Sequence, residues 1–168
     1  AYADKASRIG IRVQDVLDAK ILRQKIEVAL AEKNLWLERI YDAEPFDLED
    51  VWSQYAAFAE RLAPFVGDVS LLVDQALRDG KRVLFESAQA TMLDLDHGSY
   101  PFVTSSNPIA SGAATGIGIG PTRIDRVLGV SKAYVTRVGE GPFPSEIVGP
   151  DQARLRELGG EYGTVTGR

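Results

Sequence analysis

The 168-residue sequence contains no cysteine, which excludes disulfide bonds, zinc–thiolate sites and a cysteine nucleophile. It has no apolar run near the roughly 20 residues that cross a bilayer, and no signal-peptide pattern at its start. Its formal net charge of −5 argues against a general surface for nucleic acid or anionic membrane. We therefore expect neither nucleic acid nor membrane as a partner, and an anionic ligand would need cations placed locally.

The first half of the chain has the pattern of helices. Apolar residues recur near a 3.6-residue period over residues 16–41, and Pro45 ends this region. Asp47 is then the expected N-cap of a second helix. A third helix is predicted over residues 70–78, with Ser70 as its N-cap and Gly80 as the first residue beyond its end.

Four large side chains of the second helix follow helical spacing. These are Trp52, Tyr55, Phe58 and Leu62. Such a stripe is typical of a packed face, so we expect these residues to lie in the core.

Two later segments have the pattern of strands. Val83, Leu84 and Phe85 form a short apolar burst inside residues 82–86, and apolar residues are frequent over 127–138. Helices over residues 16–79 followed by these strands predict an α/β fold.

Polar side chains are dense after Phe85. Gln89 carries both a donor and an acceptor, so it can bind an oxo-purine edge or a phosphoryl oxygen. Thr104, Ser105, Ser106 and Asn107 form a run of neutral donors, which predicts either a phosphate cradle or a helix N-cap. Loops of this kind at strand ends are where ligands bind in α/β proteins.

The same loop contains His97, the sole histidine, which follows Asp94 and Asp96. A general base is one interpretation of His97, but a structural histidine that hydrogen-bonds the loop is favoured. Asp94 and Asp96 could form a carboxylate pair or a metal site, yet acceptors that fix the loop are the favoured interpretation.

Four blocks in one order resemble the adenylosuccinate synthetase family. The longest runs from Phe85 to Pro121 and is close to the family text Phe-Glu-Gly-Ala-Gln followed by Leu-Asp-x-Asp-His-Gly and Val-Thr-Ser-Ser-Asn. The others are Tyr2-x-x-Lys5-x-x-Arg8, the Thr-Arg-Val-Gly-Glu-Gly-Pro-Phe-Pro block over residues 136–144, and Gly-Thr-Val-Thr-Gly-Arg over 163–168.

The resemblance implies an α/β fold in which this chain holds part of a large, mostly parallel central sheet with a helical layer. Residues 1–168 would be a single internal portion of the synthetase, without the N-terminal phosphate loop and the C-terminal guanine-binding part. Residues 16–79 would form a helical section, and residues 80–168 a strand-and-loop section with the IMP and aspartate contacts.

The implied enzyme is a cytoplasmic, homodimeric ligase of purine biosynthesis that uses GTP and Mg²⁺. It joins IMP and L-aspartate to form adenylosuccinate through 6-phosphoryl-IMP. The principal GTP and Mg²⁺ sites would lie outside this chain, so the isolated chain is expected to be inactive. The alternative is a non-catalytic module for purine-nucleotide binding or dimerisation.

The resemblance also implies roles for individual residues, with no metal ligand among them. Arg8 would reach the IMP phosphate in the partner subunit, Lys5 would have a lesser positioning role, and Gln89 would face the 6-position of IMP. The remaining contacts are Thr104 with the IMP phosphate, Val138 and Gly139 with the ribose, and Thr166 and Arg168 with aspartate.

Two of the departures from the family pattern lie in the segments predicted to bind substrates. Ser87 stands where the family has the glycine of Phe-Glu-Gly-Ala-Gln, and a serine there is unfavourable if that position needs positive φ or a close nucleotide. Val165 stands where some members have a second threonine, which removes one hydroxyl from the aspartate loop.

Overall fold

The computed structural model describes residues 2–160 and residue 162, and the chain divides into two compact units. The first is Ala1–Asp68 and the second is Val69–Arg168. Each unit is described separately below.

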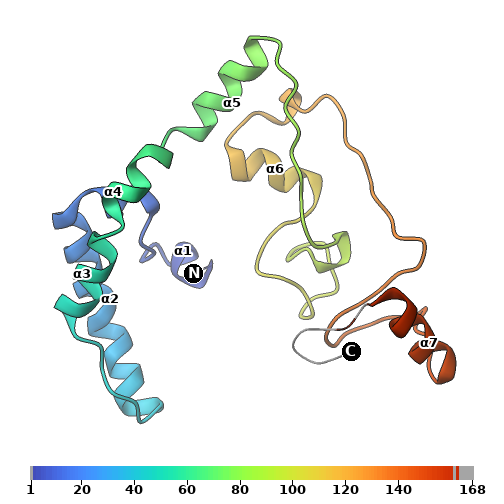
Figure 1. Cartoon of the computed structure of the whole chain (residues 1–168), viewed down its shortest axis with the longest axis horizontal. Coiled ribbons are helices and arrows are strands. Elements are labelled where there is room, and N and C mark those ends of the chain that lie inside the picture. The colour runs from blue at the N-terminus through green and yellow to red at the C-terminus, as the bar shows by residue number, and fades with distance from the viewer. Residues whose placement is uncertain (1, 161, 163–168) are drawn as a thin grey trace. The chain divides into compact units, whose positions relative to one another are not determined.

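The first unit is entirely helical in its regular structure. Its elements are α1 (Tyr2–Ala6), the 3₁₀ turn η1 (Val13–Leu17), α2 (Ala19–Ile40), α3 (Leu48–Ala56), α4 (Ala59–Leu62) and the 3₁₀ turn η2 (Ala63–Phe65). α2 packs against α3 and η1, and Figure 1 shows α2 and α3 side by side. Leu22 and Ile26 on α2 are the two fully buried hydrophobic side chains of the described residues, at 1% and 3% exposure.

Local hydrogen bonds define where these helices begin. The Asp18 carboxylate accepts from Lys20 N and Ile21 N at 3.0 Å each and so caps α2. The predicted cap of α3 is confirmed, because Asp47 Oδ1 accepts from the backbone N–H groups of Glu49 and Asp50.

The prediction of a packed aromatic face was wrong for two of its four residues. Tyr55 is 47% exposed and Phe58 is 39% exposed. The expected single helix is interrupted, because α3 ends at Ala56 and α4 starts at Ala59, so helical spacing does not hold across this break. Trp52 remains half-buried, and its indole N–H donates to Ala19 O at 3.1 Å.

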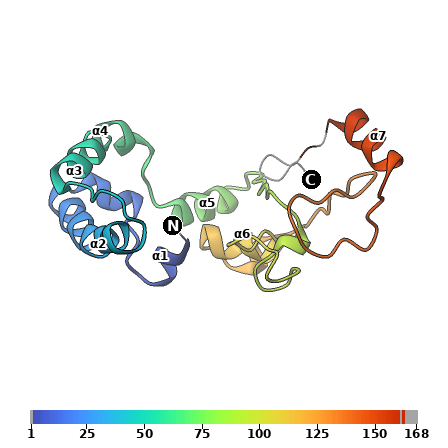
Figure 2. The same cartoon turned by 90° about the horizontal axis from the view of Figure 1, so that it is seen from below.

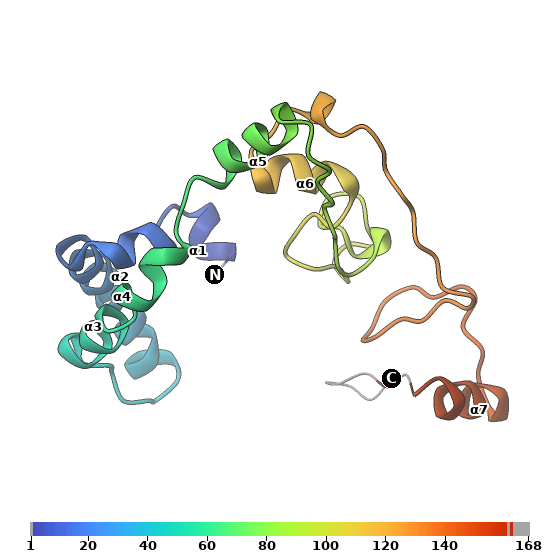
Figure 3. The ribbon, with the colours of Figure 1, turned by 45° about the horizontal axis from the view of Figure 1, so that its top comes forward.

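The second unit contains α5 (Val69–Arg78), the 3₁₀ turn η3 (Thr91–Leu93), α6 (Ala110–Ile117), the 3₁₀ turn η4 (Pro121–Arg123) and α7 (Pro150–Gly159). Figure 2 and Figure 3 show α5 beside α6. Gly80 follows α5 with φ +71°, where it donates to Leu77 O, and Lys81 N donates to Ala76 O. This pair of bonds is a Schellman motif, so the predicted role of Gly80 is confirmed.

The predicted capping role of Ser70 was wrong. Ser70 lies inside α5, and its hydroxyl donates to Ile117 O at 2.5 Å, near the end of α6. Gly118 ends α6 with φ +82°, and a Cβ there would lie 2.5 Å from Ser70 Oγ. A glycine is therefore needed where the two helices meet.

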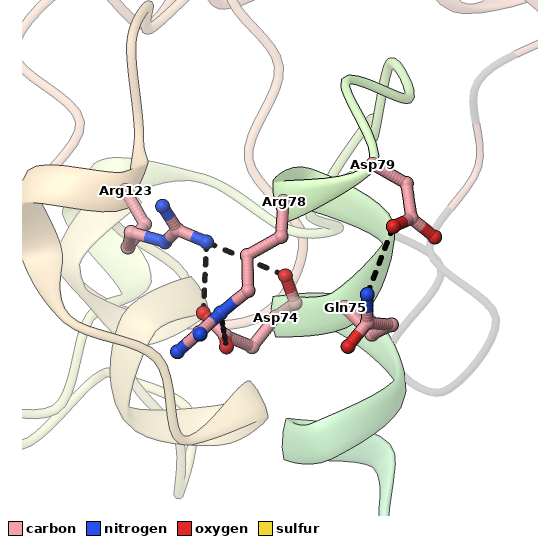
Figure 4. Close-up of polar contacts among 5 residues, drawn as sticks. All are labelled: Asp74, Gln75, Arg78, Asp79 and Arg123. Atoms are coloured by element: carbon pink, nitrogen blue, oxygen red, sulfur yellow. Dashed lines mark hydrogen bonds and ion pairs between the residues drawn. The ribbon is translucent and has the colours of Figure 1, made fainter.

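A second contact holds η4 against α5 (Figure 4). Arg123 Nη2 donates to Asp74 Oδ1 at 2.8 Å and to Asp74 O at 3.3 Å, while Arg78 Nε donates to Asp74 Oδ2 at 2.6 Å. The bond from Arg78, assisted by the charges of both arginines, lowers the pKa of the Asp74 carboxyl from its ordinary value. Asp74 is thus a charged anchor between α5 and the chain after α6.

The predicted α/β fold was wrong for the described residues, which contain helices but no β-strand. Residues 82–86 and 127–138 are irregular, and Figure 1 draws both as plain coil. Leu84 is 82% exposed and Val130 is 97% exposed. A strand exists only where a neighbouring strand supplies ladder hydrogen bonds, and neither segment has such a neighbour in the described part of the chain.

No helix among the described residues is both long enough and apolar enough to cross a membrane. The exposed apolar residues are instead spread over several elements, among them Phe65 at 85% exposure.

Candidate functional site

Gln89 has an unusual backbone conformation. Its φ is +72°, in the left-handed region that non-glycine residues seldom adopt. Its side-chain Oε1 accepts from Ser106 Oγ at 3.2 Å. Positive φ in a glutamine costs free energy and occurs preferentially at functional sites, so this geometry marks Gln89 as a candidate.

The Thr104 hydroxyl lies at the centre of a small network in the same loop. It is 3.0 Å from Ser106 Oγ, accepts from Ser106 N at 3.2 Å, and can donate to Leu93 O at 3.1 Å or Ser106 O at 3.2 Å. Ser106 therefore connects the two predicted site residues, Gln89 and Thr104. The alternative of a helix N-cap was wrong, because α6 begins after Ile109, with no side-chain cap.

A buried carboxylate organises this loop from within. Asp94 is fully buried at 0% exposure, and its Oδ1 accepts from Asp96 N at 3.0 Å, His97 N at 3.0 Å and Asn107 Nδ2 at 3.2 Å. Asn107 Nδ2 also donates to Asp96 Oδ2 at 2.7 Å. The interpretation of both aspartates as acceptors that fix the loop is confirmed.

The pKa of Asp94 reflects opposing effects. Burial disfavours the charged carboxylate, but the N–H groups of His97 and Asp96, the Asn107 amide and the Ile109 backbone all favour it. Together these donors keep the pKa of Asp94 below its ordinary value. Asp94 is therefore a charged carboxylate whose Oδ1 accepts from several parts of the loop, which suits a structural centre.

His97 contributes to this centre through its backbone rather than its imidazole. Its N–H bonds Asp94, while the residue itself is exposed. The next residue, Gly98, lies against the chain, and a Cβ there would be 2.4 Å from both Asp94 O and Met92 O. The Asp-His-Gly sequence is thus explained by tight packing of the loop, as the structural interpretation expects.

The turn that contains Val138 and Gly139 meets the same loop. Arg137 Nη2 donates to Phe102 O at 2.9 Å, and Arg137 Nε donates to Glu140 O at 3.0 Å. Sequence reasoning assigned no role to Arg137. The Gly-Glu-Gly turn that follows Arg137 is a weak sequence signal for this role, because such a turn can place a guanidinium against a neighbouring carbonyl.

Arg8 and Lys5 lie in the first unit, at the end of α1. Arg8 has φ +63°, its N–H donates to Lys5 O at 3.1 Å, and Ile9 N donates to Asp4 O at 3.0 Å. This is a Schellman motif with arginine where glycine is usual. Lys5 lies within α1, whereas Arg8 follows the end of the helix at Ala6.

Comparison with known proteins identifies the family. A family model described as adenylosuccinate synthetase matches residues 1–168. The chain belongs to the adenylosuccinate synthetase family. Adenylosuccinate synthetases from Parafrankia sp. and Frankia alni are each 58% identical to it, over 168 and 167 residues, which cover 100% and 99% of the chain. A solved structure described as fully ligated adenylosuccinate synthetase from Plasmodium falciparum matches 99% of the chain with a TM-score of 0.87 and 36% identity.

The chain spans 39% of the length of the two bacterial synthetases, and 38% of the Plasmodium falciparum chain. The resemblance found in the four sequence blocks is therefore confirmed at the level of the family. Two predicted site residues, Thr166 and Arg168, lie outside the described residues.

Ser87 is the departure from the family pattern that the structure explains. Ser87 does not have positive φ; among the described non-glycine residues, only Arg8, Asp42 and Gln89 do. Its hydroxyl donates to Pro108 O at 2.8 Å. Serine is thus accommodated without left-handed strain, and it joins the start of the loop to the residues before α6.

Proposed function

We propose that this chain supplies substrate-binding residues to a GTP-dependent ligase that joins IMP and L-aspartate. The product would be adenylosuccinate, formed through 6-phosphoryl-IMP. Membership of the adenylosuccinate synthetase family supports the reaction class. The observation that carries the proposal is the hydrogen-bonded set of Gln89, Ser106 and Thr104, with Gln89 held at φ +72°.

The chemistry of these groups suits a nucleotide monophosphate. Thr104 and its neighbours are neutral donors, which can bind phosphate oxygens. The Gln89 amide would face the 6-position of the purine, and the backbone of Val138 and Gly139 would contact the ribose. Arg137 keeps that turn against the loop through Phe102 O, so the ribose and phosphate contacts are held together.

Arg8 supplies the cation that the neutral cradle lacks. We propose that it binds the IMP phosphate of the partner subunit in a homodimer, with Lys5 in a positioning role. The left-handed backbone at Arg8 supports a functional role, because a non-glycine residue with positive φ costs backbone strain. Arginine suits phosphate because its planar fork can donate two parallel hydrogen bonds.

GTP and Mg²⁺ are proposed to bind mainly outside this chain. No group of three or more His, Cys, Asp or Glu side chains in the described part of the chain is arranged to hold a metal ion. We propose that the enzyme acts in the cytoplasm. In it, Thr166 and Arg168 would contact aspartate. The isolated chain is expected to turn over no substrate.

Calorimetric titration with IMP tests this proposal. We expect saturable binding to the chain, weakened about tenfold or more by Arg8→Leu, because a charge-assisted hydrogen bond to phosphate is lost. Arg39→Leu, at an exposed position in the last turn of α2, removes the same charge and should leave binding unchanged. Absence of saturable IMP binding would refute a nucleotide site in this chain. Product formed by the chain alone from IMP, aspartate, GTP and Mg²⁺ would refute its inactivity.

A further inference from the structure

We propose that Ser106 determines which end of the Gln89 amide faces the ligand, and that it thereby makes the site select an oxo group over an amino group at purine position 6. This inference rests on the proposed function for the identity of the ligand. Ser106 itself would be a positioning residue, since it acts through Gln89.

The contacts of Ser106 set the direction of the amide. Ser106 Oγ lies 3.2 Å from Gln89 Oε1 and 3.0 Å from Thr104 Oγ1. A hydroxyl has one proton to donate and can accept from others. The Ser106 hydroxyl can therefore accept a hydrogen bond from the Thr104 hydroxyl and donate one to Gln89 Oε1.

The neighbouring acceptors favour this order of protons. Leu93 O already receives the Thr104 backbone N–H at 2.9 Å. Thr104 Oγ1 already receives the Ser106 backbone N–H at 3.2 Å. With Ser106 Oγ donating to Gln89 Oε1, the Thr104 hydroxyl can donate to Ser106 Oγ in place of Leu93 O or Ser106 O. The hydrogen bonds then run from Ser106 N to the Thr104 hydroxyl, to the Ser106 hydroxyl and to Gln89 Oε1. Bonds ordered in one direction polarise and strengthen one another.

The consequence lies at the other end of the amide. With Oε1 bound to Ser106, the Nε2 hydrogens of Gln89 remain for a ligand, and these are donors only. A 6-oxo group or a phosphoryl oxygen can accept from them, whereas a 6-amino group meets donor against donor. In the reverse arrangement, Gln89 Nε2 would donate to Ser106 Oγ. The Gln89 carbonyl oxygen would then face the ligand.

The first test needs no ligand. In ¹³C,¹⁵N-labelled chain, Ser106→Ala should shift the Gln89 Cδ resonance upfield, because the carbonyl loses its donor, while the Nε2 hydrogens change little. Ser106→Thr keeps the hydroxyl and should restore the Cδ shift. Gln75, whose Nε2 donates to Asp79 Oδ1, is the internal control. A change confined to the Nε2 hydrogens of Gln89, or no change at all, would overturn the proposed amide direction.

The second test uses IMP and AMP as probes in calorimetry. The parent chain should bind IMP more tightly than AMP. Ser106→Ala should reduce the ratio of these two affinities about fivefold, because the hydrogen bond that fixes the Gln89 amide is lost. Ser106→Thr should keep the ratio. A ratio unchanged in Ser106→Ala would overturn the selection. If neither nucleotide binds, the proposed function fails, and the resonance of Gln89 Cδ still decides the amide direction.

Discussion

The first unit and the loop over residues 85–107 are held together in different ways. The first unit consists of helices whose apolar side chains meet, with Leu22 and Ile26 buried between α2 and its neighbours. The loop has little regular structure, and its centre is the carboxylate of Asp94, surrounded by hydrogen-bond donors. Packing of one apolar face stabilises the first region, whereas hydrogen bonds to Asp94 Oδ1 hold the second together.

This difference has a consequence for ligand binding. A loop ordered by its own hydrogen bonds holds Gln89 and Thr104 in fixed positions, which would lower the entropic cost of the proposed nucleotide binding. Helices packed on apolar side chains tolerate changes on their exposed faces. The two regions should therefore respond to different substitutions.

The largest expected effect is on the first unit. Leu22→Ala should lower its free energy of unfolding by about 3 kcal/mol, because it removes a buried side chain and leaves a cavity. Urea unfolding followed by helical circular dichroism measures the change. Leu35→Ala, in the same helix at 45% exposure, is the matched control and should cost far less. If both variants lose the same stability, burial on α2 does not hold the unit together.

The next effect is on the loop. Asp94→Asn should increase amide hydrogen exchange at Asp96 and His97 by about tenfold or more, because the neutral amide is a weaker acceptor and buries two further hydrogens. Exchange in α2 should not change. Asp151→Asn, at an exposed position in the first turn of α7, makes the same change of charge without effect on the loop. Equal exchange in both variants would contradict the central role of Asp94.

The loop should also depend on pH through Asp94. Its pKa is lower in the folded loop than in the unfolded chain, so ionised Asp94 stabilises the loop fully above about pH 4. This stabilisation should be lost as the pH falls through the folded-state pKa. The protection factor at His97 N, which is the intrinsic exchange rate at each pH divided by the observed rate, measures it, and its dependence on pH should disappear in Asp94→Asn. A loop that loosens as the pH rises would have the opposite sign and would refute the assignment.

The smallest effect concerns a helix end in the first unit. Asp47→Ala should destabilise the unit by about 1 kcal/mol, since the first N–H groups of α3 lose their acceptor. Asp47→Asn keeps an acceptor oxygen and should retain most of the stability. Thermal unfolding distinguishes the two. A loss of similar size in both variants would show that charge at Asp47, rather than capping, matters.

Features that depend on neighbouring residues were predicted well. The cap at Asp47 and the left-handed glycine at Gly80 were both confirmed, because each involves residues within about one helical turn. The four motif blocks also predicted the family, which the comparisons confirmed over the whole chain.

Features that depend on distant partners were predicted poorly. Residues 82–86 look like a strand, but a strand needs a second strand, and the sequence pattern cannot supply one. Tyr55 and Phe58 look like core residues, but both are exposed, and Phe58 lies in the break between α3 and α4. Ser70 has the composition of a cap, yet its hydroxyl binds Ile117 O, 47 positions away.

The sequence by itself therefore determined the cap of α3 at Asp47, the left-handed glycine after α5 and the family. Only the tertiary structure decided that Ser106 connects Gln89 to Thr104 across 17 positions, and that Arg137 reaches Phe102 O across 35. It also decided that Asp94 is buried at the centre of the loop. The physical reason is range: a cap or a turn is formed by adjacent residues, whereas these contacts form only after the loop has closed and placed their partners together.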